Sequence, residues 1–271
     1  YLIFSKKSKI NISVVTVLAF VLLSINNVKA QTHLTIDNAI STALKNNLEL
    51  QSHQLNVQSS TTLKKSVFEL PKTNVNFQFG QYNSINQDKA FQISQSIPFP
   101  TYYTAKAGLY KAELQGSQWQ QQATVNEIKA QVQFYFYQLQ YLQTTKKQLQ
   151  SLDSLYNDFV SAATLRYKTG ETNLLEKTTA ETKRGQLSLL LKQNETDFTT
   201  AYNSLKTLMN TSEDFAINDS GNFQPLAITS SFDTTLIANN PSLKMLYQLA
   251  VIAQQNKKVE IGSALPDFNV G

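Results

Sequence analysis

The segment Leu70-Pro71-Lys72-Thr73-Asn74-Val75 returns near the other end of the chain as Leu265-Pro266-Asp267-Phe268-Asn269-Val270. An asparagine pair precedes each copy: Asn46-Asn47 ends 24 residues before the first proline, and Asn239-Asn240 ends 26 residues before the second. Between each pair and its proline the sequence has few helix breakers, which predicts a helix. The chain therefore holds one complete structural unit, about 195 residues long, and the opening of a second.

The N-terminus has the three parts of a secretory signal peptide. Lys6, Lys7 and Lys9 form a charged region, and residues 10–25 are largely apolar. Val28-Lys29-Ala30 then offers small residues to a signal peptidase. We expect residues 1–30 to be a signal peptide, and the alternative is an N-terminal membrane anchor.

Charge and cysteine content exclude several classes of protein. The chain has 24 basic and 19 acidic residues, but four of its lysines lie within residues 1–30, so 20 basic residues and a net charge of +1 remain. This balance gives no sign of nucleic-acid binding. The absence of cysteine excludes disulfides, thiolate metal sites and a cysteine nucleophile. After residue 30 no stretch is apolar enough for a membrane helix, so any crossing of a membrane would use strands.

Residues after Pro71 change from helical spacing to strict alternation, which predicts a β-hairpin with strands at about 73–82 and 89–99. One face would be apolar and lipid-facing: Val75, Phe77, Phe79, Phe91, Ile93 and Ile97. The other face would be polar and line a pore: Asn74, Asn76, Gln78, Gln92 and Ser94. This pattern is typical of a transmembrane β-barrel strand. A soluble hairpin packed on a core has the same alternation, so that alternative stays open.

Two long helices follow, at about 101–169 and 173–209, with the turn at Gly170. The first has no proline after its start and carries apolar residues at heptad spacing: Val125, Ile128, Val132, Tyr135, Leu139, Leu142, Leu149, Tyr156, Val160 and Ala163. Lys146 and Asp153 interrupt that seam. Such a helix would be about 100 Å long and must pack along other helices. The second helix and a further one at about 48–70 together match its length, so we expect them to stack end to end beside it.

Several segments resemble the TolC-like outer membrane efflux family. Residues 34–47 resemble its opening helix, and Leu70-Pro71 resembles its helix-to-strand junction. Residues 95–100 (Gln-Ser-Ile-Pro-Phe-Pro) resemble the end of its second strand. Residues 166–176 match its tip signature, R-Y-x-x-G-x-x-S-x-x-[DE], with Asn173 in the serine place and Glu176 in the acidic one. The resemblance covers residues 34–271, and residues 99–103 look most like the heavy-metal-efflux branch.

This resemblance implies a mainly α fold with a β-hairpin. A long antiparallel helical hairpin would form part of an α-barrel, and the strands would form part of a transmembrane β-barrel. Residues 31–240 would be the first repeat, and residues 241–271 the truncated start of the second. The resemblance also implies a homotrimer in the outer membrane of a Gram-negative bacterium, extending into the periplasm. A periplasmic adaptor, joined to an inner membrane pump, would meet the hairpin tip at Arg166, Tyr167, Gly170, Glu171, Thr172 and Leu174.

No catalytic or metal-binding pattern accompanies these features. His33 would lie in the tail after the signal peptide and His53 on a polar helix face, so we expect both to be solvated. No set of His, Asp and Glu residues has metal-ligand spacing, no glycines form a phosphate loop, and no cofactor is expected. We therefore predict a non-enzymatic channel subunit of a tripartite efflux or type I secretion system. The alternative is a periplasmic or surface coiled-coil scaffold that forms no channel.

Overall fold

The computed structural model describes residues 32–81, 85, 87–217 and 237–271. The expected signal peptide, residues 1–30, lies outside the described residues. Within the described part of the chain, no helix is both long and apolar enough to span a membrane.

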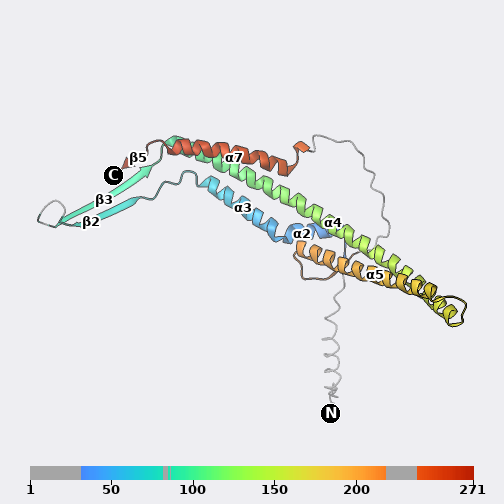
Figure 1. Ribbon diagram of the computed structural model, residues 1–271. Helices are drawn as coiled ribbons and strands as arrows, with labels where there is room; N and C mark the ends of the chain where they lie inside the picture. Colours follow the sequence, from blue (N-terminus) through green and yellow to red (C-terminus); the bar gives the residue numbers. More distant parts are fainter. Residues whose placement is uncertain (1–31, 82–84, 86, 218–236) are drawn as a thin grey trace, which may run out of the picture.

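A single helix, α4 (Pro100–Lys168), runs from the sheet to the tip of the helical hairpin with the other helices against it (Figure 1). α3 (Leu48–Lys65) and α7 (Pro241–Ser263) flank the half of α4 that lies next to the sheet. α5 (Leu174–Leu208) returns along the other half and makes the long hairpin with α4. Both long helices begin and end within one residue of the bounds expected from the sequence.

Three antiparallel strands form the sheet at one end of the molecule: β2 (Asn74–Gly80), β3 (Asp88–Ile97) and β5 (Phe268–Val270). β3 lies in the middle. β3 ends two residues before the expected bound because Phe99 is the N-cap of α4 and Pro100 its first residue. The ring of Phe99 stacks on Phe268 of β5, with 5.6 Å between the ring centroids.

The helix expected at 48–70 is shorter than predicted, because α3 ends at Lys65. The chain then turns so that the side chain of Val67 is buried and the ring of Phe68 stacks on Tyr103, 6.1 Å away. Leu70 precedes a proline, and such residues avoid the helical conformation. The packing of Val67 and Phe68 therefore ends the helix before Pro71 can.

The hydrophobic core lies midway along α4, where α2 (Ile36–Asn46), the start of α3, the end of α5 and a small sheet converge. That sheet pairs β1 (Thr32–Leu34) in parallel with β4 (Phe215–Ile217). Phe215 and Ile217 are buried in the core, although the sequence analysis gave this segment no strand. The prediction that His33 lies in a free tail is wrong, because it pairs with Ala216 in β1. Its side chain is nevertheless exposed.

Two asparagines join α3 and α5 end to end, as the sequence analysis expected of these helices. Asn47 Oδ1 accepts hydrogen bonds from Glu49 N and Leu50 N, at 3.0 and 3.1 Å, and so caps α3. Its Nδ2 donates to the carbonyl of Leu208, the last residue of α5, at 3.2 Å. Asn210 Nδ2 donates to Asn46 O, also at 3.2 Å. One amide therefore satisfies the start of one helix and the end of the other.

The two polar interruptions of the α4 seam each face an opposite charge on α5. Lys146 Nζ lies 3.8 Å from Glu195 Oε1, and Asp153 Oδ1 lies 3.7 Å from Arg184 Nε. These pairs are partly exposed, so each contributes at most about 1 kcal/mol. The pairs also set the register of the hairpin, because they favour one alignment of α4 and α5 along their length.

Candidate functional site

The sheet has one apolar and one polar face, and its register keeps the two apart. Val75 pairs with Ile93, and Phe77 pairs with Phe91. Asn74 pairs with Ser94, and Asn76 with Gln92, on the opposite face. β5 continues both rows, because its apolar residues pair with Gln95 and Ile97 while its asparagine pairs with Ser96. All eleven residues expected on the two faces therefore lie on the face that the sequence analysis gave them.

Most of the apolar face has no cover from the rest of the described chain. Ile97 is half-buried. The other large apolar side chains of the face are each 50–64% exposed: Val75, Phe77, Phe79, Phe91, Ile93, Phe268 and Val270. Soluble monomers rarely expose a contiguous apolar patch of this kind. The open alternative of a hairpin packed on its own core does not match this exposure.

A lysine lies at one end of the apolar face, and a glutamine interrupts the face near its other end. At one end Lys89 pairs with Phe79, and its Nζ lies 5.6 Å from the centre of that ring. At the other end Gln95 bonds to the junction between α3 and β2: its Nε2 donates to Pro71 O at 2.8 Å, and its Oε1 accepts from Thr73 Oγ1 at 2.6 Å. From Lys89 to Ile97, the last residue of β3, the face is about 27 Å long at 3.4 Å per residue. That length fits the roughly 25 Å apolar band of membrane strands.

The hairpin tip between α4 and α5 is a defined reversal rather than a loose loop. Gly170 has a φ of +77°, which glycine adopts without the strain other residues meet. Glu171 N donates to Arg166 O at 2.8 Å, and Gly170 N donates to Tyr167 O at 3.2 Å. These two bonds are those of a Schellman motif, which satisfies the last carbonyls of α4.

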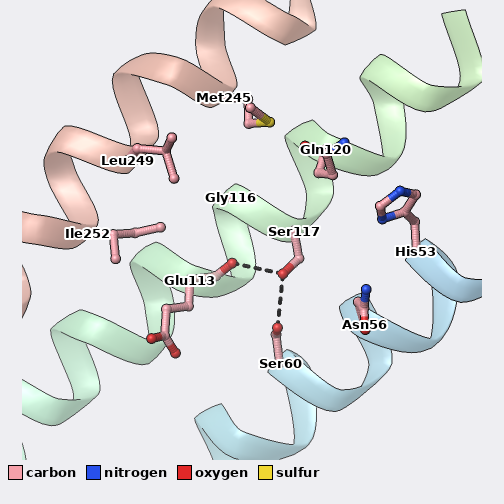
Figure 2. A pocket seen from close by; sticks show the side chains of 10 residues that line it. All are labelled: His53, Asn56, Ser60, Glu113, Gly116, Ser117, Gln120, Met245, Leu249 and Ile252. Carbon is pink, nitrogen blue, oxygen red and sulfur yellow. Dashed lines mark hydrogen bonds between the residues drawn. The ribbon is translucent and has the colours of Figure 1, made fainter. Parts of the chain in front are cut away.

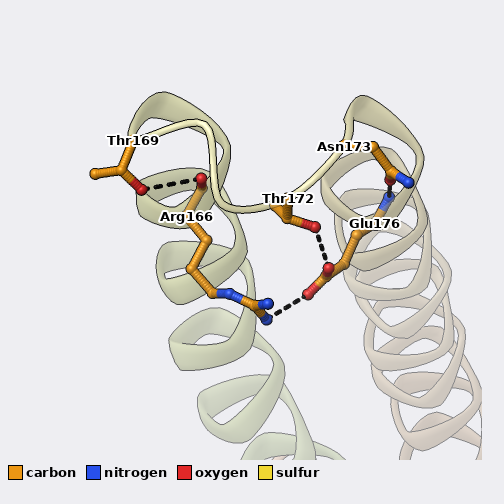
Figure 3. Close-up of polar contacts among 5 residues, drawn as sticks. All are labelled: Arg166, Thr169, Thr172, Asn173 and Glu176. Carbon is orange, nitrogen blue, oxygen red and sulfur yellow. Dashed lines mark hydrogen bonds and ion pairs between the residues drawn. The ribbon is translucent and has the colours of Figure 1, made fainter.

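A carboxylate on α5 ties the two sides of the tip together (Figure 3). Glu176 Oε1 lies 2.9 Å from Arg166 Nη1, and Glu176 Oε2 accepts a short hydrogen bond from Thr172 Oγ1. Asn173 Oδ1 accepts from Glu176 N at 3.1 Å and so caps α5. Arg166 therefore has a partner within its own hairpin, which the sequence analysis did not assign to it.

All six residues predicted for adaptor contact lie together at the tip; Thr172 is half-buried, and the other five are exposed. Tyr167 is 40% exposed and Leu174 57% exposed. Two apolar neighbours of the tip were not predicted, because they are not among the residues that define the tip signature. Leu165 and Leu175 are 64% and 73% exposed, and they widen the apolar part of the tip.

A groove crosses α4 between α3 and α7, as Figure 2 shows. Met245, Leu249 and Ile252 of α7 form its apolar side, and the α3 and α4 sides are mostly polar. The hydroxyls of Ser60 and Ser117 lie 3.0 Å apart and bond to each other. Ser117 Oγ also donates to Glu113 O at 3.1 Å. No cluster of three potential metal ligands occurs among the described residues.

The same fold occurs in solved outer membrane channels. The outer-membrane channel OprN superposes with a TM-score of 0.69 at 12% identity, over 86% of this chain and 57% of that one. For CusC the TM-score is 0.68 at 15% identity, over 88% and 59%. The CmeC outer membrane channel of Campylobacter jejuni gives 0.69 at 13% identity, over 86% and 54%. The chain therefore spans somewhat more than half the length of these channels.

No protein-family model and no curated protein matches the sequence. The structural likeness alone shows the fold, and it confirms at that level the resemblance to TolC-like outer membrane channels read from the sequence. The similar structures are channels rather than enzymes.

Proposed function

We propose that this protein is a subunit of an outer membrane channel, the exit duct of a tripartite efflux or type I secretion system. Solutes would pass through it passively, across the periplasm and the outer membrane. The observation that carries this proposal is the largely uncovered apolar face of the sheet, backed by a polar face on which Asn74, Asn76, Gln78, Gln92 and Ser94 are uncharged. The shared fold with channels gives independent support.

The two faces of the sheet would do different work in the membrane. Apolar side chains such as Phe77 and Phe91 would contact lipid, where burial of apolar surface favours insertion. The opposite face, with Asn74, Asn76 and Gln92, would line a wet pore. Its amides and hydroxyls carry no charge, so varied solutes could pass without tight binding.

The tip would meet a periplasmic adaptor that connects to an inner membrane pump. Its exposed apolar residues, Tyr167, Leu174, Leu165 and Leu175, would supply the contact area. The bond between Arg166 and Glu176 would fix the shape of the reversal rather than bind the adaptor directly. The resemblance to the TolC-like family further implies three subunits, each contributing four strands to one twelve-stranded barrel.

Fractionation of the full-length protein in its native host tests the proposal. We expect a heat-modifiable oligomer in the outer membrane fraction, and ion conductance after the purified oligomer enters a planar lipid bilayer. A soluble periplasmic protein without conductance would instead support the coiled-coil scaffold. Such a scaffold would leave the apolar face of the sheet to another protein.

A further inference from the structure

The groove across α4 lies on the concave side of three helices. Gln248 of α7 donates to Ala112 O on one side of α4, and Ser60 of α3 bonds to Ser117 on another. Ala112 and Ser117 are five residues apart, which places α7 and α3 about 140° apart around α4. The three helices therefore curve around the groove, which has a volume of about 510 Å³. Pockets of this size accept small organic molecules.

One wall of the groove is apolar and partly open to solvent. α7 supplies this wall with Met245, Leu249 and Ile252. Leu249 is 52% exposed, and the other two are half-buried. Covering exposed apolar surface with an apolar ligand removes that surface from water, which is favourable. The wall therefore favours a ligand with an apolar body.

A carboxylate without a partner lines the same groove (Figure 2). Glu113 is half-buried, and among the described residues its carboxylate has no ion pair and no hydrogen bond. The two nearby hydroxyls cannot donate to this carboxylate. Ser117 gives its proton to the carbonyl of Glu113, so Ser60 must donate to Ser117. Because a partly buried charge is costly without an opposite charge, a cationic ligand would be stabilised here.

The positive side chains near the groove do not neutralise this carboxylate. Lys106, two turns earlier on α4, has its Nζ 5.6 and 5.5 Å from the ring centres of Tyr102 and Tyr110. His53 lines the groove, but its Nε2 lies 4.0 Å from a carboxylate oxygen of α3 itself. Lys64, near the end of α3, is exposed and does not line the groove. The groove therefore presents one unpaired negative charge beside an apolar wall.

We propose that this groove is a binding site for organic cations with an apolar body. The cation pairs with the carboxylate of Glu113, and the body covers the three apolar side chains of α7. An anion of the same shape loses that attraction and is repelled by the carboxylate. The inference goes beyond the proposed function, and it holds whether or not the protein forms a channel.

Two ions of the same shape and opposite charge test the site. Purified full-length protein in nanodiscs of zwitterionic lipid is dialysed against tetraphenylphosphonium or tetraphenylborate, and empty nanodiscs give the background. We expect saturable binding of the phosphonium. Binding of the borate should be weaker by about tenfold or more, because the sign of the interaction with Glu113 reverses. Equal binding of the two ions, or no saturable binding of the phosphonium, overturns the inference.

Paired substitutions locate the site. Glu113→Gln removes the charge and keeps the shape of the side chain, and Asp158→Asn does the same at an exposed position of α4 outside the groove. We expect the first to weaken phosphonium binding by about fivefold and the second to leave it unchanged. On α7, Leu249→Ser should weaken binding and Leu246→Ser should not, because Leu246 is 58% exposed but does not line the groove.

The outcomes separate this inference from the proposed channel. Unchanged phosphonium binding in Glu113→Gln overturns the site, and equal binding by the two serine variants overturns the apolar contact. The comparison of the two ions uses the unaltered protein, so it does not depend on the folding of any variant. Phosphonium binding by a protein that gives no conductance supports the site and contradicts only the channel.

Discussion

At the residue scale, Asn47 shows how one side chain can hold two helices in line. It is 8% exposed, caps α3 through its oxygen and binds the last carbonyl of α5 through its nitrogen. We expect Asn47→Ala to lower the free energy of unfolding by about 1–3 kcal/mol, since both the cap and a buried hydrogen bond are lost. Asn47→Asp keeps the cap and loses the donor. In urea unfolding its stability should therefore lie between those of the wild type and Asn47→Ala. Equal stability of Asn47→Asp and Asn47→Ala would show that the cap contributes nothing.

Two glycines on helices offer a matched comparison of contact and conformational effects. A methyl group at Gly262 would lie 3.1 Å from Tyr102 Cα, whereas one at Gly185 would have nothing within 4 Å. Gly262→Ala must push α7 away from α4, and we expect it to destabilise the protein by about 1–3 kcal/mol. Gly185→Ala should stabilise α5 by about 0.5–1 kcal/mol, because alanine is the better helix former. Thermal unfolding of both variants measures the difference, and stabilisation by both would mean that the α4–α7 approach is loose.

Lys206 gives a pH dependence to the stability of the region where the end of α5 meets β4. Its hydrogen bond to Asp214, 2.7 Å long, raises the pKa of the lysine above its usual 10.5. A group with a raised pKa stabilises the fold fully below its unfolded pKa, and this contribution is lost as pH rises through the folded value. We expect the wild type to be more stable than Lys206→Met at pH 9, and the gap to narrow as pH rises above about 10.5. Urea midpoints across that range measure it, and a constant gap would mean that the ion pair does not titrate.

At the element scale, the sheet can be tested with two neighbouring residues of β2. Phe77 pairs with Phe91 on the apolar face, and Gln78 pairs with Ala90 on the polar face. Phe77→Arg would place a charge in lipid, at a cost of about 2–4 kcal/mol near the bilayer midplane. Gln78→Arg would place the same charge in a wet pore. We expect the first variant to lose most of its outer membrane oligomer and the second to keep it. Equal assembly of both would contradict the membrane role of the apolar face.

The elements also show how far the sequence determines the candidate site. Strict alternation was enough to place Phe77 and Asn76 on opposite faces, because a strand has a period of two. The tip signature placed Arg166 and Gly170 at the reversal. It did not reveal that Arg166 bonds to Glu176, nor that Leu175 is exposed beside it. Those facts depend on how two helices meet, and neither helix carries that information alone.

At the scale of the whole molecule, length is the property that the fold makes definite. α4 has 69 residues and β3 has 10, which at 1.5 and 3.4 Å per residue give about 100 and 34 Å. The stacked α3 and α5 pack against α4 along most of that length. We therefore expect α4 to stay extended. We expect electron microscopy of detergent-solubilised particles to show a longest dimension of about 130 Å or more. A compact particle about half as long would mean that the hairpin bends at the join between α3 and α5.

The sequence by itself determined the periodicities of this protein: the repeat, the long helices, the alternating strands and the glycine at the reversal. Each of these depends on a local rule, the period of a helix or strand or the φ that only glycine adopts freely. The tertiary structure decided where α3 ends, that Phe215 and Ile217 belong to the core, and that Asn47 joins two helices. Within the described residues it also left Leu55 of α3 and Leu246 of α7 exposed. Those outcomes depend on contacts between residues far apart in the chain, and local spacing does not encode which surfaces meet.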